Sequence, residues 1–165
     1  MRAVVQRCKS ASVIVDDEVV SSIENGICVF IGISRDDTGK DIEYMIQKLL
    51  NLKIYPDENG EKWSCSVKDK QYEVLLISQF SLYCIFKGTK PNFHLSMEQN
   101  IAEKCYSDFV KAMKQAYSDE HVKDGKFGIK RQINVQHDGP VLINLESPRE
   151  PVLEQTQSEK PEADQ

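Results

Sequence analysis

The sequence predicts one domain of the α/β class, in which strands come first, two helices follow and further strands close the chain. Three observations support this prediction. A chain of 165 residues is long enough to bury a core and has the length of one domain. Residues 4–15 and 27–33 are rich in β-branched and apolar side chains. Two further segments, residues 42–50 and 97–117, carry apolar side chains at helical spacing.

The N-terminal strands are separated by short polar turns. Residues 4–15 and 18–23 flank the pair Asp16-Asp17, which predicts a hairpin. Asn25-Gly26 marks the next turn. The continuous apolar run at residues 27–33 then predicts a buried, central strand.

A first helix is predicted after residues 36–38, which offer two aspartates and a threonine as N-caps. Its apolar positions have helical spacing: Ile42, Met45, Ile46, Leu49 and Leu50. Residues 53–63, interrupted by a proline and a glycine, indicate a hairpin or a short excursion. Residues 74–77 predict a second buried strand.

A second, longer helix is predicted from about residue 97 to residue 117. Its inner face would consist of Ile101, Cys105, Phe109, Ala112, Met113 and Ala116. Two or three strands should follow and end at residue 146. Residues 148–165 are rich in Pro, Glu and Gln, which predicts a disordered acidic tail.

Composition and charge limit the classes of function. The formal net charge of -5 argues against broad coating of nucleic acid, although basic residues gather locally at Lys87 and Lys90 and in residues 123–131. These residues predict either a solvated surface or contacts to a few phosphates. The start reads as a strand instead of a signal peptide, and no apolar run reaches about 20 residues, so we expect a cytoplasmic protein without a membrane partner.

The five cysteines are widely spaced and form no CxxC or Cys/His cluster. We therefore expect no metal site and no cofactor. Cys28 lies inside the apolar run 27–33, which predicts a buried thiol in a reducing compartment.

A polar sequence follows the second buried strand: Ser78-Gln79-Phe80-Ser81-Leu82. Hydroxyl and amide groups at the end of a buried strand are typical of active sites. The sequence has no GxSxG motif and no histidine that a pattern ties to these serines. If chemistry occurs here, we expect hydrogen-bond donors around an oxyanion instead of a protein nucleophile. The alternative is a strand that simply has a polar end.

The second candidate is Asp138-Gly139-Pro140, between alternating segments at residues 133–135 and 141–145. These residues predict a turn between two strands. Either it is an ordinary type I or type II turn, or the Gly-Pro bond is cis and directs two successive carbonyls to the same side. A rigid pair of carbonyls is suited to reading the shape of a small ligand.

Both motifs resemble those of one family, the D-aminoacyl-tRNA deacylases. Residues 78–82 resemble its SQFTL motif, and Asp138-Gly139-Pro140-Val141 resembles its NDGPVT motif. Residues 1–7, 32–34, 87–94 and 123–128 also look like its eukaryotic members. The resemblance covers residues 1–147, which we take as the deacylase domain.

The resemblance implies a compact domain of layered β-sheets with two main flanking helices, assembled as a homodimer. It implies hydrolysis of the ester of D-aminoacyl-tRNA, and of mischarged glycyl-tRNA, so that D-residues stay out of translation. Gly139-Pro140 would be a Gly-cisPro element that reaches across the dimer into the partner's pocket. There its carbonyl oxygens would clash with an L side chain.

The same resemblance assigns roles to further residues. Ser78, Gln79, Phe80 and Ser81 would form the catalytic side of the pocket at the 3′ end of tRNA, where the substrate's own 2′-hydroxyl replaces a protein nucleophile. Arg7, Leu82 and Val141 would support the pocket. Lys87, Lys90 and Lys126 are the candidate tRNA contacts.

The chain departs from the family pattern at several positions. Ser81 and Leu142 replace threonines, so the second substitution loses a hydroxyl near the Gly-Pro element. His137 stands where asparagine is usual, and residues 129–131 (Ile-Lys-Arg) replace small and apolar ones. These changes affect the shape of the pocket more than the fold.

Three functions therefore compete. The first is the tRNA-directed esterase. The second is a dimeric module of the same fold that binds nucleic acid or protein with weakened catalysis, for which Leu142 is the argument. The third is a generic serine hydrolase, which would depend on Ser78 or Ser81 and react with a serine-directed probe.

Overall fold

The structure is a computed structural model that describes residues 1–149 of the chain. Its main sheet has six strands in the order β2-β1-β3-β4-β7, with β8 paired to β1, and a small second sheet pairs β5 with β6. The strands are β1 (Arg2–Val15), β2 (Glu18–Ile23), β3 (Gly26–Gly32), β4 (Glu73–Ser78), β5 (Ile85–Lys87), β6 (Lys90–Asn92), β7 (Val122–Asp124) and β8 (Gln132–Glu146); the helices are α1 (Gly39–Asn51), α2 (Gln99–Ala116) and the one-turn helix η1 (Phe80–Tyr83). The predicted tail lies outside the described residues from residue 150 onward.

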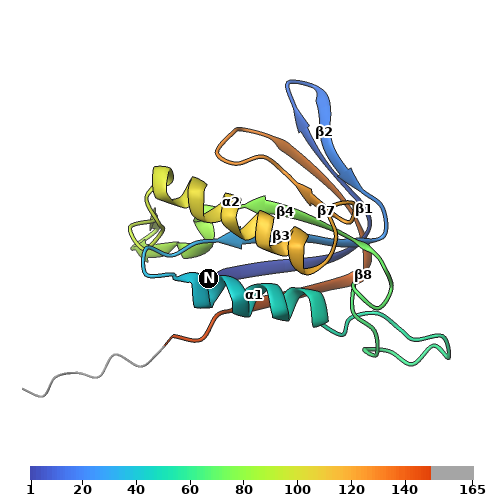
Figure 1. Cartoon of the computed structure of the whole chain (residues 1–165). Helices are drawn as coiled ribbons and strands as arrows, with labels where there is room; N and C mark the ends of the chain where they lie inside the picture. Colours follow the sequence, from blue (N-terminus) through green and yellow to red (C-terminus); the bar gives the residue numbers. More distant parts are fainter. Residues whose placement is uncertain (150–165) are drawn as a thin grey trace, which may run out of the picture.

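The long strand β1 gives the sheet its shape. One edge of β1 pairs antiparallel with β8 along nearly its whole length. Its other edge pairs with β3 over residues 2–8 and with β2 over residues 11–15. The second half of β1 therefore leaves the plane of β3 and β4 together with β2, as Figure 1 shows. The strands β3, β4 and β7 are parallel to one another.

This curvature produces two hydrophobic clusters on opposite faces of the sheet. The larger cluster lies under α1 and α2 and includes Val29, Leu49 and Phe109. The smaller cluster includes Cys28 and Val13 and lies where β2 and the start of β8 fold over the sheet. The mixed α/β class and the two flanking helices are thus confirmed.

The prediction of a buried thiol at Cys28 is confirmed, because the side chain is 0% exposed. Burial raises the pKa of this thiol to about 12, since the thiolate would lose its hydration. Among the described residues, no helix is long and apolar enough to cross a membrane.

Helix α1 follows the sequence prediction closely. Thr38 is its N-cap, and Asp41 completes a capping box by accepting hydrogen bonds from the Thr38 N–H (2.8 Å) and hydroxyl (3.0 Å). The predicted inner face is largely confirmed, because Met45, Ile46, Leu49 and Leu50 are buried.

The predicted inner face of α2 is confirmed in part. Phe109 and Met113 are buried, and Cys105 and Ala112 pack against the larger cluster. Ile101 is 58% exposed and Ala116 is exposed, so these two positions are wrong. The buried face also includes Tyr106, whose hydroxyl lies 2.9 Å from the Leu76 carbonyl oxygen and 2.8 Å from Asp124 Oδ1.

The predicted turn between two closing strands is also wrong. Residues 132–146 form a single strand, β8, and Gly139-Pro140 lies inside it. Gln6 pairs with Leu142 and Cys8 pairs with His137, so residues 138–141 stand opposite Arg7 alone. We call these four residues the 138–141 bulge. The extra residues leave the β1–β8 ladder without ending the strand.

The tyrosine that orients α2 offers a test of this packing. We expect Tyr106→Phe to lower the free energy of unfolding by about 1 kcal/mol, because a buried hydrogen bond is lost while the ring stays in place. Urea denaturation monitored by circular dichroism measures the change. Tyr44→Phe, on the surface of α1, is the matched control and should leave the stability unchanged. Equal stability of Tyr106→Phe and the parent protein would contradict this account of α2.

Candidate active site

The polar end of β4 lies beside a cavity. Ser78 is the last residue of β4, and the Gln79 N–H donates a 2.7 Å hydrogen bond to the Ile31 carbonyl of the neighbouring strand β3. Gln79 Nε2 lies 2.5 Å from Ser81 Oγ, which fixes the amide across the first turn of η1. The predicted residues at this position are therefore held rigidly by main-chain and side-chain contacts.

The cavity at this position, which we call the strand-end cavity, has a volume of about 750 Å³. Three of the four predicted catalytic residues line it: Ser78, Gln79 and Phe80. The rest of the wall comes from the end of β3, the segment between β6 and α2, the start of α2, and residues 127–133, and its apolar part includes Phe93, Met97, Ala102, Phe127 and Ile129. Ser81 and Leu82 are not part of the wall. A cavity of this size and lining accommodates a small organic ligand.

Among the described residues, no base is hydrogen-bonded to Ser78, whose hydroxyl accepts from Arg131 Nη2 at 3.2 Å. No histidine or cysteine of the described chain lines the strand-end cavity, and Glu98 is the only carboxylate among its lining residues. A serine without a partnered base is a weak nucleophile. The geometry thus argues against a generic serine hydrolase.

Phe80 lies at the rim of the cavity. Its side chain is 60% exposed, so it is not part of the hydrophobic core. The ring packs edge-on against Phe93, with 5.0 Å between the ring centroids, and the Phe80 carbonyl accepts a 2.8 Å hydrogen bond from Ser96 Oγ. The exposed face of an oriented aromatic ring is available to a ligand.

Sequence reasoning missed the contribution of Arg131, which it noted only as a departure from the family pattern. Arg131 Nη2 donates to the carbonyl oxygen (2.6 Å) and to the hydroxyl (3.2 Å) of Ser78. Its Nη1 donates to the carbonyl oxygens of Lys126 and Ile129. One guanidinium therefore joins the end of β4 to the segment that forms the opposite wall. The available signal was the replacement of the family's small and apolar residues by Ile-Lys-Arg at residues 129–131.

The Gly139-Pro140 peptide bond in the bulge is cis. Gly139 has φ +124°, and a Cβ there would lie 3.1 Å from Arg7 Nη2 and 3.2 Å from the Val141 backbone nitrogen. Both the backbone conformation and the lack of space therefore favour glycine. Pro140 is exposed, and Val141 packs against the larger hydrophobic cluster.

Arg7 braces this bulge. Its Nε donates to the Asp138 carbonyl oxygen (3.1 Å) and lies 3.1 Å from the Asp138 carboxylate. Its Nη1 donates to the Ile54 carbonyl oxygen, so the loop after α1 is joined to the bulge as well. These contacts tie Arg7 to the bulge, and its support of the pocket stays a prediction. Leu82, by contrast, contacts the other end of β1, where its carbonyl oxygen accepts from Arg2 Nη1 at 3.0 Å.

The chain does not bring its two candidate motifs together. Ser78 pairs with Ile31 of β3, and Ile31 pairs with Ala3 of β1. The bulge stands opposite Arg7, four residues and roughly 13 Å further along β1. In Figure 1 the arrowhead of β4 points to the left, away from the labelled part of β8 at the right of the sheet. Neither Gly139 nor Pro140 lines the strand-end cavity.

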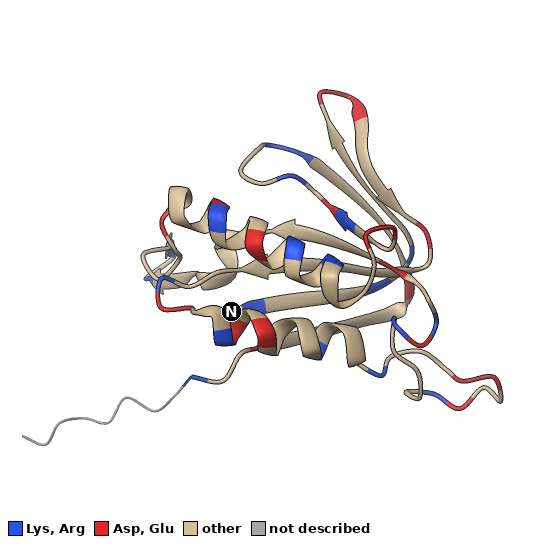
Figure 2. Cartoon of the chain, in the orientation of Figure 1, with Lys and Arg blue, Asp and Glu red and all other residues tan. Residues whose placement is uncertain are grey.

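The candidate tRNA contacts lie on the surface. Lys87 and Lys90 are exposed on the β5–β6 hairpin, and Lys126 is exposed in the segment that Arg131 holds. Figure 2 shows basic and acidic residues interspersed over the molecule instead of forming one positive band. Contacts to phosphate would therefore be local.

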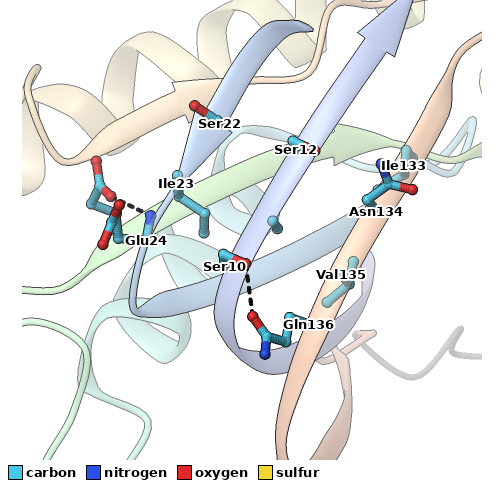
Figure 3. Close-up of a pocket in the computed structure, with 11 residues that line it drawn as sticks. Ser10, Ser12, Ser22, Ile23, Glu24, Ile133, Asn134, Val135 and Gln136 are labelled. Atoms are coloured by element: carbon cyan, nitrogen blue, oxygen red, sulfur yellow. Dashed lines mark hydrogen bonds between the residues drawn. The ribbon is translucent and has the colours of Figure 1, made fainter.

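A second cavity, of about 830 Å³, lies in an open groove between β1, β2 and β8. Figure 3 shows that polar side chains dominate its lining, including Ser10, Ser12, Ser22, Asn134 and Gln136. Ser10 Oγ and Gln136 Oε1 lie 3.4 Å apart across it. It contains none of the residues that the sequence singled out, so its size does not make it the active site.

Comparisons with known proteins indicate one family. Residues 4–146 match the sequence pattern of the family described as D-Tyr-tRNA(Tyr) deacylase. The chain is 55% identical over 148 residues to "D-aminoacyl-tRNA deacylase 1" of Bos taurus, which covers 90% of this chain and 71% of that protein. It is 48% identical over 150 residues to "D-aminoacyl-tRNA deacylase" of Drosophila melanogaster, covering 91% of this chain and 94% of that protein.

Two solved structures share the fold. The structure titled "c-Myc DNA Unwinding Element Binding Protein" has a TM-score of 0.88 and 52% identity, over 90% of this chain and 100% of that chain. The structure titled "Structural Analysis of a probable eukaryotic D-amino acid tRNA deacylase" has a TM-score of 0.73 and 19% identity, over 87% of this chain and 98% of that chain, and supports the fold alone. The extent of the family match and the identity to its members show that the chain belongs to the D-aminoacyl-tRNA deacylase family of hydrolases.

Proposed function

We propose that this protein hydrolyses the ester bond of D-aminoacyl-tRNA in the cytoplasm and releases free D-amino acid and tRNA. One observation carries the proposal: a rigid polar strand end faces an apolar cavity whose lining offers no nucleophile–base pair. Such a site suits a substrate that brings its own hydroxyl to the reaction. The family membership of the chain is consistent with this reading.

The catalytic contribution of the chain would be electrostatic. The first N–H groups of a helical turn have no acceptor within the turn, so the Phe80 and Ser81 N–H groups at the start of η1 are available as donors. We assign them to the oxyanion that develops on the ester carbonyl. The 2′-hydroxyl of the terminal adenosine would assist in place of a protein nucleophile. Ser78 and Gln79 would then orient the substrate instead of attacking it.

Selection against L-amino acids would come from the main chain of the bulge. An L side chain would collide with the Gly139 and Pro140 carbonyl oxygens, whereas a D side chain points away and glycine has none. Mischarged glycyl-tRNA would accordingly be a second substrate. The exposure of Pro140 and the anchoring of the bulge by Arg7 support this role, because a rejecting surface has to be both accessible and rigid.

A complete site would require a second copy of the chain. The bulge and the strand-end cavity lie at different ends of one molecule, so they meet only if the bulge of one subunit enters the cavity of another. A two-fold homodimer satisfies this requirement and forms two equivalent sites. Val141 would support the bulge from the core side, through its packing on the larger cluster.

A second candidate function has one observation in its favour. A relative at 52% identity carries a title that names it a DNA unwinding element binding protein. The chain could therefore bind nucleic acid without cleaving an ester, with Leu142 as the sign of weakened catalysis. The net charge of -5 counts against strong binding of duplex DNA.

A single assay distinguishes the two candidate functions. We expect the purified protein to release D-tyrosine from D-tyrosyl-tRNA at least roughly 100-fold faster than it releases L-tyrosine from L-tyrosyl-tRNA, because steric rejection acts on the L side chain. Release of labelled amino acid measures both rates. Ser22→Ala, in the groove between β1 and β2, is the matched control and should behave like the parent protein. Binding of tRNA without any release would favour the second candidate.

Complementation tests whether the site is shared between subunits. We expect Gly139→Val, which damages the bulge, and Ser78→Phe, which fills the cavity, each to be inactive. If each site combines two chains, mixing the variants and allowing exchange should restore about one quarter of the parent activity. Random pairing makes half of the dimers mixed, with one intact site in each. Absence of any recovery in dimers shown to have exchanged would refute the shared site.

The position of Ser78 should depend on Arg131. We expect Arg131→Met to lower kcat by roughly 10-fold or more, because Ser78 and the segment at residues 126–129 lose their common donor. Arg131→Lys should recover part of the loss, since it restores one donor to Ser78. Steady-state kinetics on D-tyrosyl-tRNA, with circular dichroism to verify folding, gives the comparison. Unchanged kcat in a folded Arg131→Met variant would exclude this role.

A further inference from the structure

We propose that the exposed Phe86–Pro91 face of the β5–β6 hairpin is a stacking platform for a base of the single-stranded 3′ end of tRNA. In this proposal Lys87 and Lys90, at the tip of the hairpin, neutralise phosphates next to that base. The inference rests on the proposed function. It adds a binding surface outside the strand-end cavity and assigns a role to Phe86, which lies outside both sequence motifs.

Phe86 has no structural role that explains its position. Its side chain is 70% exposed, the highest value among the exposed large hydrophobic residues of the described chain. It lies on a hairpin of only two three-residue strands, which has no other strand beside it. An exposed aromatic residue here loses the free energy of burial, so the fold alone gives no reason for it.

The register of the hairpin defines two faces. Phe86 pairs with Pro91, and Lys87 pairs with Lys90. Directly opposed residues of antiparallel strands project to the same face, and neighbours along a strand project to opposite faces. The Phe ring and the Pro ring therefore form one apolar face, and the two ammonium groups lie behind it at the tip. This arrangement suits a base on the apolar face with phosphates passing around the tip.

The hairpin is continuous with the rim of the strand-end cavity. β5 begins two residues after η1, and β6 is followed immediately by Phe93, whose ring packs on Phe80 with 5.0 Å between centroids. Both ends of the hairpin are thus anchored at the rim, and it projects from the end of the molecule where α2 begins (Figure 1). A single-stranded RNA end whose terminal nucleotide occupies the strand-end cavity would pass this hairpin.

Local charge favours a nucleic-acid strand as the occupant. The chain has 26 acidic residues, yet residues 74–97 contain none, while Lys87 and Lys90 are both in this stretch. The segment from β4 to the start of α2 therefore places no carboxylate that would repel a polyanion. Aromatic faces combined with cations are how single-stranded nucleic acids are bound without base-specific hydrogen bonds.

Binding measurements separate the aromatic contribution from the charge contribution. The probes are deacylated tRNA and the same tRNA trimmed of its single-stranded 3′ nucleotides, titrated at several KCl concentrations. We expect Phe86→Ala to weaken binding of full-length tRNA by roughly 5- to 100-fold, with no change in salt dependence, because one stacked base is lost. It should leave the affinity for trimmed tRNA unchanged.

The lysines should affect the salt dependence instead. We expect Lys87→Ala/Lys90→Ala to reduce the slope of log K against log salt concentration by about 1.4, which is about 0.7 for each phosphate contact to a single strand. Two matched controls lie away from the hairpin: Val19→Ala, an exposed apolar residue on β2, and Lys62→Ala/Lys68→Ala, two exposed lysines between α1 and β4. Both controls should bind like the parent protein.

Hydrolysis assays distinguish this inference from the proposed function. D-aminoacyl-adenosine lacks the rest of the RNA strand, so Phe86→Ala should cleave it at the rate of the parent protein. The same variant should cleave D-aminoacyl-tRNA with a raised KM. If the parent protein cleaves neither substrate, the proposed function fails. If the parent cleaves both and Phe86→Ala binds full-length tRNA with parent affinity, the platform is refuted. A change in subunit association of Phe86→Ala, measured by light scattering, with tRNA affinity unchanged would also refute it and would identify the face as a contact between subunits.

Discussion

The bulge in β8 depends on a single guanidinium. Between its pairing with Cys8 and its pairing with Gln6, strand β8 contains four residues that face Arg7 alone. A sheet interrupted in this way would leave backbone groups unpaired, and an unpaired buried polar group is costly. The donors of Arg7 take the place of the missing ladder, because they bond to the carbonyl oxygens of Asp138 and Ile54 and pair with the Asp138 carboxylate. The bulge can therefore be rigid although it leaves the sheet.

The end of β4 uses the same physical device. Arg131 bonds to Ser78 at the end of β4 and to two carbonyl oxygens of the segment before β8. In both places a planar cation with several donors joins backbone segments that no sheet or helix connects. The two arginine side chains thereby hold these backbone carbonyl groups in fixed positions. The chiral selection that we propose needs this kind of rigidity, because the two substrates differ only in the direction of one side chain.

The sequence predicted most elements because their signals are local. Thr38 and Asp41 form a cap through contacts within one turn, and the apolar spacing of α1 is repeated often enough to define its buried face. The face of α2 was predicted only in part because Tyr106 counts as polar in a pattern, whereas its hydroxyl has hydrogen-bond partners on β4 and β7. A turn was predicted inside β8 because a Gly-Pro pair is typical of turns. Only the presence of β1 alongside keeps both halves of the strand in one ladder.

The sequence by itself determined the α/β class, the two helices and the two motifs, including the glycine at residue 139. Short-range conformational preferences and the recurrence of residue types carry this information. Only the tertiary structure decided that Ser78 is held by Arg131 and that Arg7 fills the gap beside the bulge. It also decided that the two motifs are separated in space within one molecule. These facts depend on contacts between residues 53 to 131 positions apart. Composition and residue spacing do not encode these long-range contacts. The contacts form only when β1 pairs with β2, β3 and β8 and the sheet is complete.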